Sequence, residues 1–119
     1  MIDFACKTFN IDEIIKCGLG LTKVELEIFY FLLKADDMIS SKELSVKINR
    51  DNSTVQRALK KFYERELVDR KQINLKKGGY SFIYSVKSKT EIKNILIKII
   101  HKWVSNVETA FDSWANSLD

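Results

Sequence analysis

The stretch NRDNSTVQRALKKFYERELVDRK, residues 49–71, contains the pattern that decides the fold. It opens with polar residues, and Ser53 is of the type that caps a helix N-terminus. Apolar positions then recur at helical spacing, namely Val55, Ala58, Leu59 and Phe62. The opposite side carries Thr54, Gln56, Arg57, Lys60, Lys61 and Glu64. This pattern predicts a helix over 53–66 with one face in a core and a basic, hydrogen-bonding face in solvent.

A shorter helix is predicted just before it. Ser40 or Ser41 can cap this helix, and Leu44 and Ile48, four residues apart, share one face. Residues 49–52 form a polar turn between the two helices. Two helices joined by a short turn, the second with a basic outer face, are typical of a helix-turn-helix.

The N-terminal third predicts two further helices. Residues 9–17 read as a short helix with Asn10 or Asp12 as the cap, broken by Gly18 and Gly20. The segment TKVE, residues 22–25, has the sequence of a capping box. It opens the run VELEIFYFLLKA, which has almost no polar side and should be the central core helix. We expect Asp36 and Asp37 to end that helix.

Two β-rich runs follow the basic helix. They are LVDRKQINLKK and YSFIYSVKS, joined through Lys76-Lys77-Gly78-Gly79. The paired glycines supply the positive φ that a tight hairpin turn needs. A hairpin directly after a helix-turn-helix makes the unit a winged helix. The predicted fold class is mainly α with a small β-hairpin (α+β).

These segments resemble winged-helix transcription regulators of the MarR and TrmB type, found in archaea and bacteria. The matching pieces are LTKVELEIFYFLL, SSKELSVKIN, NSTVQRALKKF, ELVDRK and KKGGYSFIYSV. Such proteins commonly have Gly before the Leu-Val that opens the first wing strand, where the helix end favours a left-handed residue. This chain has Glu66 there, which puts the angle of the wing in question. The resemblance implies a winged helix-turn-helix that binds double-stranded DNA.

The distribution of charge agrees with a polyanionic partner. The net charge is +4. Residues 41–89 hold thirteen Lys or Arg and five Asp or Glu, a net charge of +8, whereas residues 1–40 carry −3 and residues 90–119 carry −1. A basic segment between acidic flanks suggests nucleic acid. A solvated lysine-rich face is equally compatible with the charge alone.

The resemblance implies that helix 53–66 enters the major groove with its first turns. Asn52, Ser53 and Thr54 lie near the helix N-terminus, which favours a phosphate. Gln56 and Arg57 can reach base edges, and we expect them to read sequence. Backbone or minor-groove contacts are expected from Ser41, Lys42, Arg50, Lys60, Lys61, Arg70, Lys71, Lys76, Lys77, Gly78 and Gly79. For each residue taken alone, a solvated surface position is the alternative.

The C-terminal segment predicts one helix of ~29 residues, because it contains neither Pro nor Gly after Thr90. One apolar stripe has alternating spacings of three and four: Ile97, Ile100, Val104, Val107, Phe111, Trp114 and Leu118. An adjoining stripe contains Ile92, Leu96, Ile99 and Trp103. We expect one stripe to pack on the chain's own domain, near residues 11–15, and the other on a second copy. An intramolecular helix without a dimer is the alternative.

Together these features predict a DNA-binding region at 1–88 and a dimerisation helix at 89–119 within one compact domain. A homodimer would present two recognition helices to half-sites about one DNA turn apart. The function expected is that of a sequence-specific transcription regulator, with repression the simplest mechanism. The alternatives are an interaction or architectural module of a transcription or replication assembly, and an RNA-binding protein, against which stands the lack of an exposed aromatic array.

Enzymatic chemistry is poorly supported. With His101 as the single histidine, a His-pair metal site is not possible, and Cys6 and Cys17 lie outside any CxxC spacing. We therefore expect no catalysis, no metal and no cofactor. No apolar run approaches the ~18 residues of a membrane span, and Asp3 interrupts any signal-peptide core. A cytoplasmic protein is the expectation, with any small-molecule effector left undefined.

Overall fold

The computed structural model describes residues 1–35 and 37–119. Contacts group residues 22–89 into one compact unit and residues 1–21 with 90–119 into another. The first of these units contains the helices and strands that the opening stretch predicted. The second combines the N-terminal segment with the C-terminal helix.

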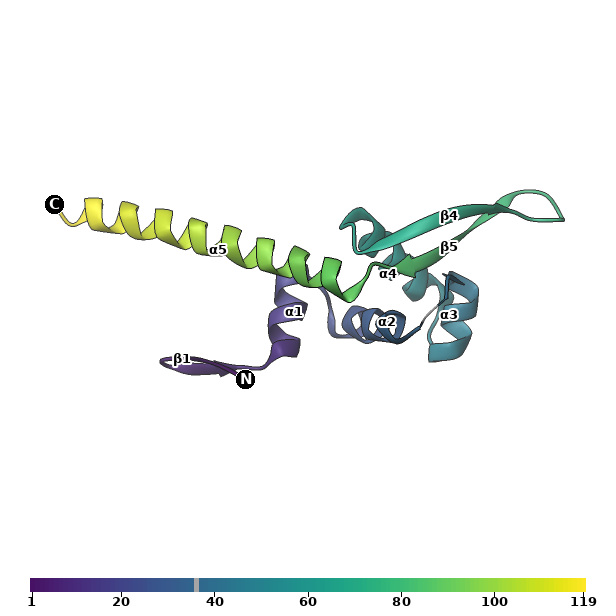
Figure 1. The fold of residues 1–119 in the computed structure, drawn as a ribbon, viewed down its shortest axis with the longest axis horizontal. Helices are drawn as coiled ribbons and strands as arrows, with labels where there is room; N and C mark the ends of the chain where they lie inside the picture. Colours follow the sequence, from purple (N-terminus) through teal and green to yellow (C-terminus); the bar gives the residue numbers. More distant parts are fainter. Residues whose placement is uncertain (36) are drawn as a thin grey trace. The chain divides into compact units, whose positions relative to one another are not determined.

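The unit of residues 22–89 is a winged helix. Its elements in chain order are α2 (Lys23–Lys34), β3 (Ile39–Ser40), α3 (Ser41–Ile48), α4 (Asn52–Glu64), β4 (Val68–Asn74) and β5 (Tyr80–Val86). The strands form one antiparallel sheet in the order β3-β5-β4. Figure 1 shows β4 and β5 extending as a long hairpin past the ends of the helices of this unit. The predicted fold class is therefore confirmed.

Side-chain caps define the helix starts. The capping box of α2 is present as predicted: the Glu25 N–H donates to Thr22 Oγ1, and Glu25 Oε1 accepts from the Thr22 N–H. Ser40 caps α3. The predicted cap of α4 was wrong, because Asp51 Oδ2 accepts from the Thr54 N–H at 3.1 Å and Ser53 lies in the first turn. A carboxylate is well placed at a helix N-terminus, where it also interacts with the dipole.

The core of this unit forms where α2 crosses α4. The rings of Phe29 and Phe62 meet edge to face with centroids 5.6 Å apart, and both side chains are buried. Val55, Ala58 and Leu59 are also buried, so the predicted inner face of α4, the second helix of the helix-turn-helix, is confirmed. Burying each of the large side chains contributes roughly 1.5–3 kcal/mol. The core therefore determines which side of α4 is left exposed.

Helix α2 is followed by a strand, β3, that the sequence did not predict. The helix ends at Lys34, with the Ala35 N–H donating to the carbonyls of Phe31 and Leu32. Asp36, which we expected to end the helix, lies outside the described residues. Strand β3 is only two residues long and pairs Ile39 with Tyr84 of β5. A strand so short has no recognisable alternation, which is why it was missed.

The turn of the wing follows the prediction. Gly78 has φ 91° and Gly79 has φ 79°, both in the region that favours glycine. The Leu75 N–H donates to the Gly79 carbonyl at 3.1 Å, which closes the turn. The register between the strands places Arg70 opposite Tyr84 and leaves the two lysines at the exposed tip.

Glu66 occupies the left-handed position at the end of α4, with φ 61°. Its N–H donates to the Tyr63 carbonyl at 3.0 Å, and the next N–H, of Leu67, donates to the Phe62 carbonyl at 2.9 Å. These bonds end the helix and direct the chain into β4. The geometry of a glycine cap is thus kept without the glycine, at a backbone cost of roughly 1–2 kcal/mol.

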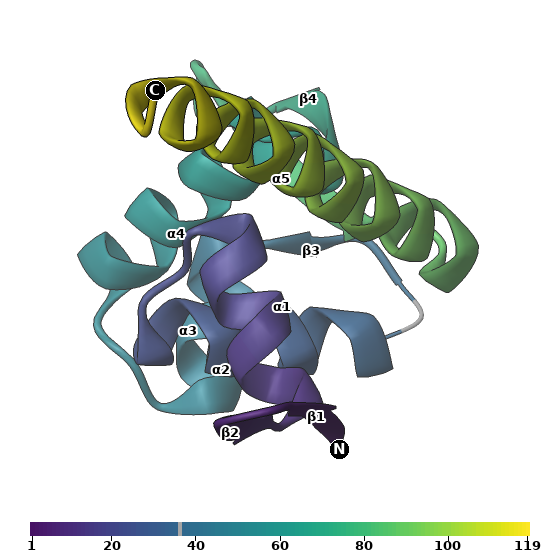
Figure 2. The same cartoon turned by 90° about the vertical axis from the view of Figure 1, so that its left-hand side faces the viewer.

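The other unit contains a hairpin and two helices. Strands β1 (Ile2–Phe4) and β2 (Lys7–Phe9) pair and lead into α1 (Ile11–Leu19), as Figure 2 shows. The hairpin was not predicted, because three-residue strands are too short for a periodicity. Asn10 caps α1 as one of the two predicted candidates, but Gly18 lies inside the helix and Gly20, with φ 66°, ends it.

Helix α5 (Lys89–Ser117) has the 29 residues that the sequence predicted. Gly18 of α1 lies beside this helix: a Cβ added there would stand 3.7 Å from Leu96 Cδ2 and 3.9 Å from Ile99 Cγ2, which is ordinary van der Waals contact. The second apolar stripe therefore meets α1 near Gly18, somewhat beyond residues 11–15. Among the described residues, no helix is long and apolar enough to cross a membrane.

Replacing Glu66 with glycine should stabilise the protein. Glycine removes the steric cost of the left-handed backbone but adds chain entropy to the unfolded state, so we expect Glu66→Gly to raise the free energy of unfolding by about 0.5–1 kcal/mol. Urea denaturation followed by circular dichroism measures this. The matched control is Glu64→Gly in the last helical turn, which should destabilise. Equal losses from both variants would contradict the role given to the backbone at Glu66.

Candidate nucleic-acid interface

The exposed side of α4 presents three long polar side chains. Gln56, Arg57 and Lys60 are exposed, while Ala58 and Leu59 between them and Phe62 on the next turn are buried. Arg57 Nη2 donates to Thr54 Oγ1 at 3.5 Å, which aligns the guanidinium along the first two turns of the helix. The predicted polar outer face of α4 is therefore present in the N-terminal half of the helix.

The N-terminus of α4 is already occupied by a carboxylate. Asp51 Oδ2 accepts from both the N–H and the hydroxyl of Thr54, at 3.1 and 3.3 Å. Asn52 and Ser53 are exposed beside it. An anion approaching this helix end would meet the negative charge of Asp51 as well as the helix dipole, which makes the site less favourable for a phosphate than the sequence suggested.

A groove separates α4 from the wing. It has a volume of about 340 Å³ and is open to solvent. The residues that line it are Ser41, Gln56, Lys60, Arg70, Tyr80, Ser81, Phe82 and Tyr84. Four of these residues were predicted as DNA contacts: Ser41 of α3, Gln56 and Lys60 of α4, and Arg70 of β4. Two of the four are cationic, so the groove favours an anionic group.

Arg70 is held by aromatic rings. Its guanidinium carbon lies 3.9 Å from the ring centroid of Tyr63 on α4 and 4.2 Å from that of Phe82 on β5. Cation–π attraction of this kind contributes roughly 0.5–1 kcal/mol at exposed sites. Arg70 therefore connects the recognition helix to the wing, in addition to placing a positive charge at the groove.

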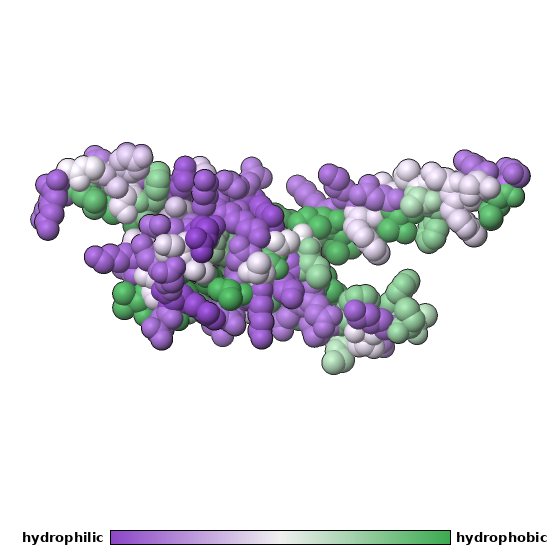
Figure 3. All heavy atoms as spheres, turned by 180° about the vertical axis from the view of Figure 1, so that it is seen from behind, coloured by the Kyte–Doolittle hydropathy of each residue, from purple (hydrophilic) through white to green (hydrophobic). Residues whose placement is uncertain are grey.

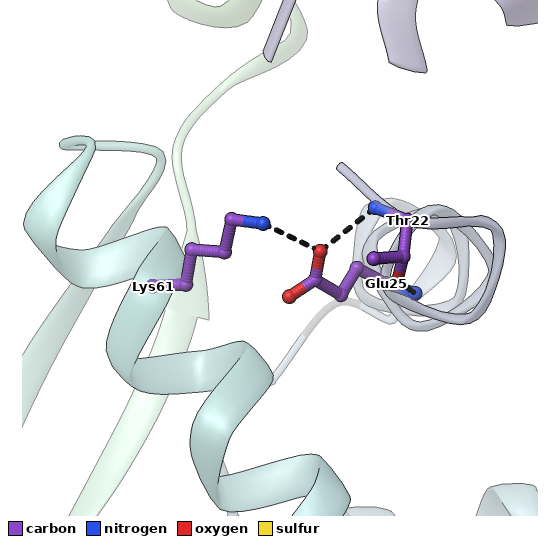
Figure 4. A network of polar contacts seen from close by, with 3 residues as sticks. All are labelled: Thr22, Glu25 and Lys61. Atoms are coloured by element: carbon purple, nitrogen blue, oxygen red, sulfur yellow. Dashed lines mark hydrogen bonds and ion pairs between the residues drawn. The ribbon is translucent and has the colours of Figure 1, made fainter. Parts of the chain in front are cut away.

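Lys61 has different surroundings from those predicted. Its Nζ lies 2.7 Å from Glu25 Oε1, the same oxygen that accepts from the Thr22 N–H (Figure 4). Both side chains are mostly buried, with 26% and 16% of their surface exposed. Lys61 thus joins α4 to the start of α2 and does not belong to the solvent-facing side of α4. Burial alone would raise the pKa of Glu25, but the hydrogen bonds from Lys61 and Thr22 outweigh it and lower that pKa.

Arg50 also has an intramolecular partner. Its Nη2 lies 2.7 Å from Glu27 Oε2, and both side chains are about half exposed. An exposed pair of this kind contributes little to stability, about 0–1 kcal/mol. The guanidinium can exchange Glu27 for another anion at small cost, so Arg50 stays among the candidate contacts.

The remaining predicted residues lie on exposed surface. Lys42 is exposed on α3, and Lys76 and Lys77 are at the wing tip with the two glycines. Lys71 follows Arg70 along β4 and pairs with Ile83, so it lies on the other face of the hairpin from the groove. The wing therefore presents positive charge at its tip and on both faces.

The apolar stripe of α5 lies open to solvent in the single chain. The fractional exposures run from 39% at Ile100 to 66% at Leu118, and Val107 is half-buried. Trp103 of the second stripe is also exposed, at 63%, whereas Ile92 is buried. Figure 3 shows hydrophobic atoms recurring along this helix between hydrophilic ones.

Sequence reasoning missed two groups at the groove. Tyr80 and Ser81 line it, although neither was among the predicted contacts. The alternation of Tyr80, Phe82 and Tyr84 was the available signal, because it places all three on one face of the strand. Their ring contacts, with centroids 5.5 and 6.4 Å apart, confirm that shared face. Over the described part of the chain, no cluster of His, Cys, Asp or Glu could hold a metal ion.

The fold and this surface define a class of protein, the winged-helix proteins that include transcription regulators. A solved structure from Methanosarcina mazei, described as a possible transcriptional regulator, is 43% identical, covers 96% of both chains and superposes with a TM-score of 0.89. MarR shares the fold at 18% identity, with a TM-score of 0.53 over 90% of this chain and 85% of that one. The predicted resemblance is confirmed.

The chain belongs to the DnaD N-terminal domain family, which it matches over residues 9–107. It is also 32% identical over 114 residues to the protein MJ1503 of Methanocaldococcus jannaschii, an alignment that covers 96% of this chain and 83% of the relative. The match thus includes the recognition helix, the wing and the first part of α5.

Neutralising Glu25 should destabilise the protein in a pH-dependent way. We expect Glu25→Gln to lower the free energy of unfolding by about 1–2 kcal/mol at pH 7. Because the pKa of Glu25 is lowered in the folded protein, this contribution is complete above the unfolded-state pKa and is lost as the pH falls through the folded-state pKa. Denaturant titrations of both proteins between pH 7 and pH 3 measure it.

The control is the same substitution in a Lys61→Met background. There Glu25→Gln should lower the free energy of unfolding by less, because the charged partner is gone. A difference between wild type and Glu25→Gln that stays constant down to pH 3 would contradict the ion pair.

Proposed function

We propose that this protein is a sequence-specific, double-stranded DNA-binding transcription regulator that acts as a homodimer, with repression by promoter occlusion as the simplest mechanism. The observation that carries the proposal is the exposed side of α4, where Gln56 and Arg57 point to solvent from a helix whose other side is locked in the core. Arginine pairs with guanine and glutamine with adenine in the major groove.

The groove and the wing extend this surface. Lys60 and Arg70 would bind the backbone of a DNA strand that passes between α4 and the wing, with Ser41 and Ser81 as hydrogen-bond donors. Lys76 and Lys77 at the wing tip would reach the next phosphates or the minor groove. The similarity to the Methanosarcina mazei protein, described as a possible transcriptional regulator, supports the same role.

The homodimer is proposed from the exposed stripe of α5. Apolar side chains left open along a helix of 29 residues favour a protein partner. A second copy would place two recognition helices on one duplex, so we expect an inverted repeat whose half-sites lie about one helical turn apart.

Selection from a random pool tests the whole proposal. Purified protein is incubated with random duplexes at physiological salt, and the bound fraction is sequenced. We expect an inverted repeat with half-sites roughly 10 base pairs apart. Enrichment of no sequence, with only salt-sensitive general binding, would contradict the regulator and favour an architectural or interaction module.

Two single variants should separate base reading from backbone binding. Arg57→Ala should weaken the free energy of binding to the selected site by about 1–3 kcal/mol, and that to random DNA much less, because it removes a base contact. Lys77→Ala should weaken binding to both and reduce the salt slope by about one unit. Fluorescence anisotropy over a salt series measures both. Equal losses on both duplexes for Arg57→Ala would contradict its role in base readout.

The cap of α4 gives a further prediction. Asp51→Asn keeps a good capping residue but removes the negative charge next to the DNA-facing side, so stability should change by less than about 0.5 kcal/mol while DNA affinity rises several-fold at low salt. Thermal unfolding and anisotropy titrations measure the two quantities. As a control, Asp69→Asn on β4 removes the same charge without altering a cap. An unchanged or weaker affinity for Asp51→Asn would show that Asp51 does not face the DNA.

A further inference from the structure

One face of the wing is rich in aromatic rings. Residues that lie directly opposite each other share a face of an antiparallel hairpin. The residues that share this face are Arg70, Gln72 and Asn74 of β4 and, opposite them, Tyr84, Phe82 and Tyr80 of β5. It therefore carries one cation, two side-chain amides and three aromatic rings. Arg70 and the three aromatic residues also line the groove beside α4, so this face forms one wall of the groove.

The rings become more accessible towards the tip of the wing. Tyr84 is buried, Phe82 is half-buried, and Tyr80, next to the turn, has 58% of its surface exposed. The rings of Tyr80 and Phe82 meet edge to face, with centroids 5.5 Å apart and planes at 70°. Such a contact occupies at most one flat face of each ring. Tyr80 therefore has a flat face available to another planar group.

Both walls of the groove carry positive charge. Lys60 comes from α4 and Arg70 from β4, on either side of the hollow of about 340 Å³. The Arg70 guanidinium is held 3.9 Å from the ring centroid of Tyr63 and 4.2 Å from that of Phe82, so its charge is already ordered before a ligand binds. The residues that line the hollow include no carboxylate. The groove is therefore suited to an anionic chain that also carries planar groups.

We propose that this groove binds unpaired nucleotides of a single-stranded nucleic acid, with a base stacked on Tyr80 and the neighbouring phosphates on Lys60 and Arg70. Aromatic rings beside a basic groove are the combination that single-strand binding uses, because every base has a flat π face. In a duplex the bases stack on one another, so their faces are out of reach of a tyrosine on the groove wall. This activity is additional to the proposed duplex binding and does not rest on it.

The inference reverses an expectation drawn from the sequence. A lack of exposed aromatic residues is the argument that the sequence offers against single-strand binding. In the structure, β3 pairs only with Ile83 and Tyr84, whereas Tyr80 lies in the part of the hairpin that extends past the helices (Figure 1). The apolar alternation of β5 therefore reaches solvent at its first residue. Gln72 and Asn74, exposed on the same face, supply donors and acceptors for the edge of a stacked base.

Titration with short oligonucleotides tests the proposal. The full chain is titrated into a labelled oligothymidylate of about 12 nucleotides, which lies within the usual range of site sizes, and into an abasic strand of the same length. We expect the oligothymidylate to bind roughly tenfold more tightly in fluorescence anisotropy, because only that strand can stack on a ring. Equal affinities would overturn the proposal, since they leave only the attraction of charges. The same titration with an oligouridylate distinguishes DNA from RNA as the source of the strand.

Substitution of the exposed ring tests its role. Tyr80→Leu should weaken binding of the oligothymidylate roughly tenfold, whereas Tyr80→Phe should keep most of the affinity because it keeps the ring. The matched control is Phe4→Leu, which removes an exposed aromatic ring from the other unit of the chain and should leave the affinity unchanged. An unchanged affinity for Tyr80→Leu, or an equal loss for Phe4→Leu, would overturn the proposal. Circular dichroism of each variant checks that the helices are intact.

The path of the strand has its own test. Lys60→Met should reduce the salt slope of oligothymidylate binding by about 0.7, the contribution of one phosphate on a single strand. An unchanged slope would contradict a strand that passes between α4 and the wing.

A duplex separates this site from the proposed function. Tyr80→Leu should weaken binding to a blunt duplex of random sequence much less than binding to the single strand, because paired bases offer no free face. Equal losses on the two would show that the ring contacts a duplex, and would overturn the single-strand site while leaving the proposed regulator intact. A large loss on the single strand alone, together with no enriched duplex sequence, would keep this site and remove the regulator.

Discussion

The contact between Phe29 of α2 and Phe62 of α4 is the constraint on which the interface depends. It buries the apolar side of the recognition helix and so determines which residues of α4 remain in solvent. The ion pair of Glu25 with Lys61 holds the same two helices one turn away. Because a packed core resists rotation of the helix about its axis, Gln56 and Arg57 have a defined direction before any partner arrives.

Local rules explain why much of this fold could be predicted. The capping box at Thr22 and Glu25, the helical spacing from Val55 to Phe62, and the glycine pair of the hairpin each act within a few residues. The outer face of α4 follows directly, because it is what remains when the inner face is assigned. The open stripe of α5 could be predicted for the same reason, since its spacing is read along a single helix.

Two kinds of feature could not be predicted from the sequence. One is contacts between residues far apart in the chain, and the other is the choice between neighbouring residues that could fill the same role. Lys61 has the spacing of an outward residue, yet it pairs with Glu25, which is 36 positions away. Arg70 meets Tyr63 and Phe82 only because the wing folds back towards α4. At the start of α4, Asp51 and Ser53 are both good caps, and their order of preference depends on the turn that precedes them. The short strands β1 and β3 carry no periodic signal.

The distant contacts change the electrostatics of the interface more than its shape. A count of cations in the sequence would assign Lys61 to the DNA, but its ammonium is already neutralised by Glu25, and Arg50 must leave Glu27 before it can bind a phosphate. Each phosphate contact adds roughly 0.9 to the salt slope of binding to duplex DNA, so the slope expected for the proposed DNA binding is smaller than the net charge of this segment suggests. For the proposed regulator, a smaller electrostatic contribution would leave a larger share of the DNA affinity to base reading by α4.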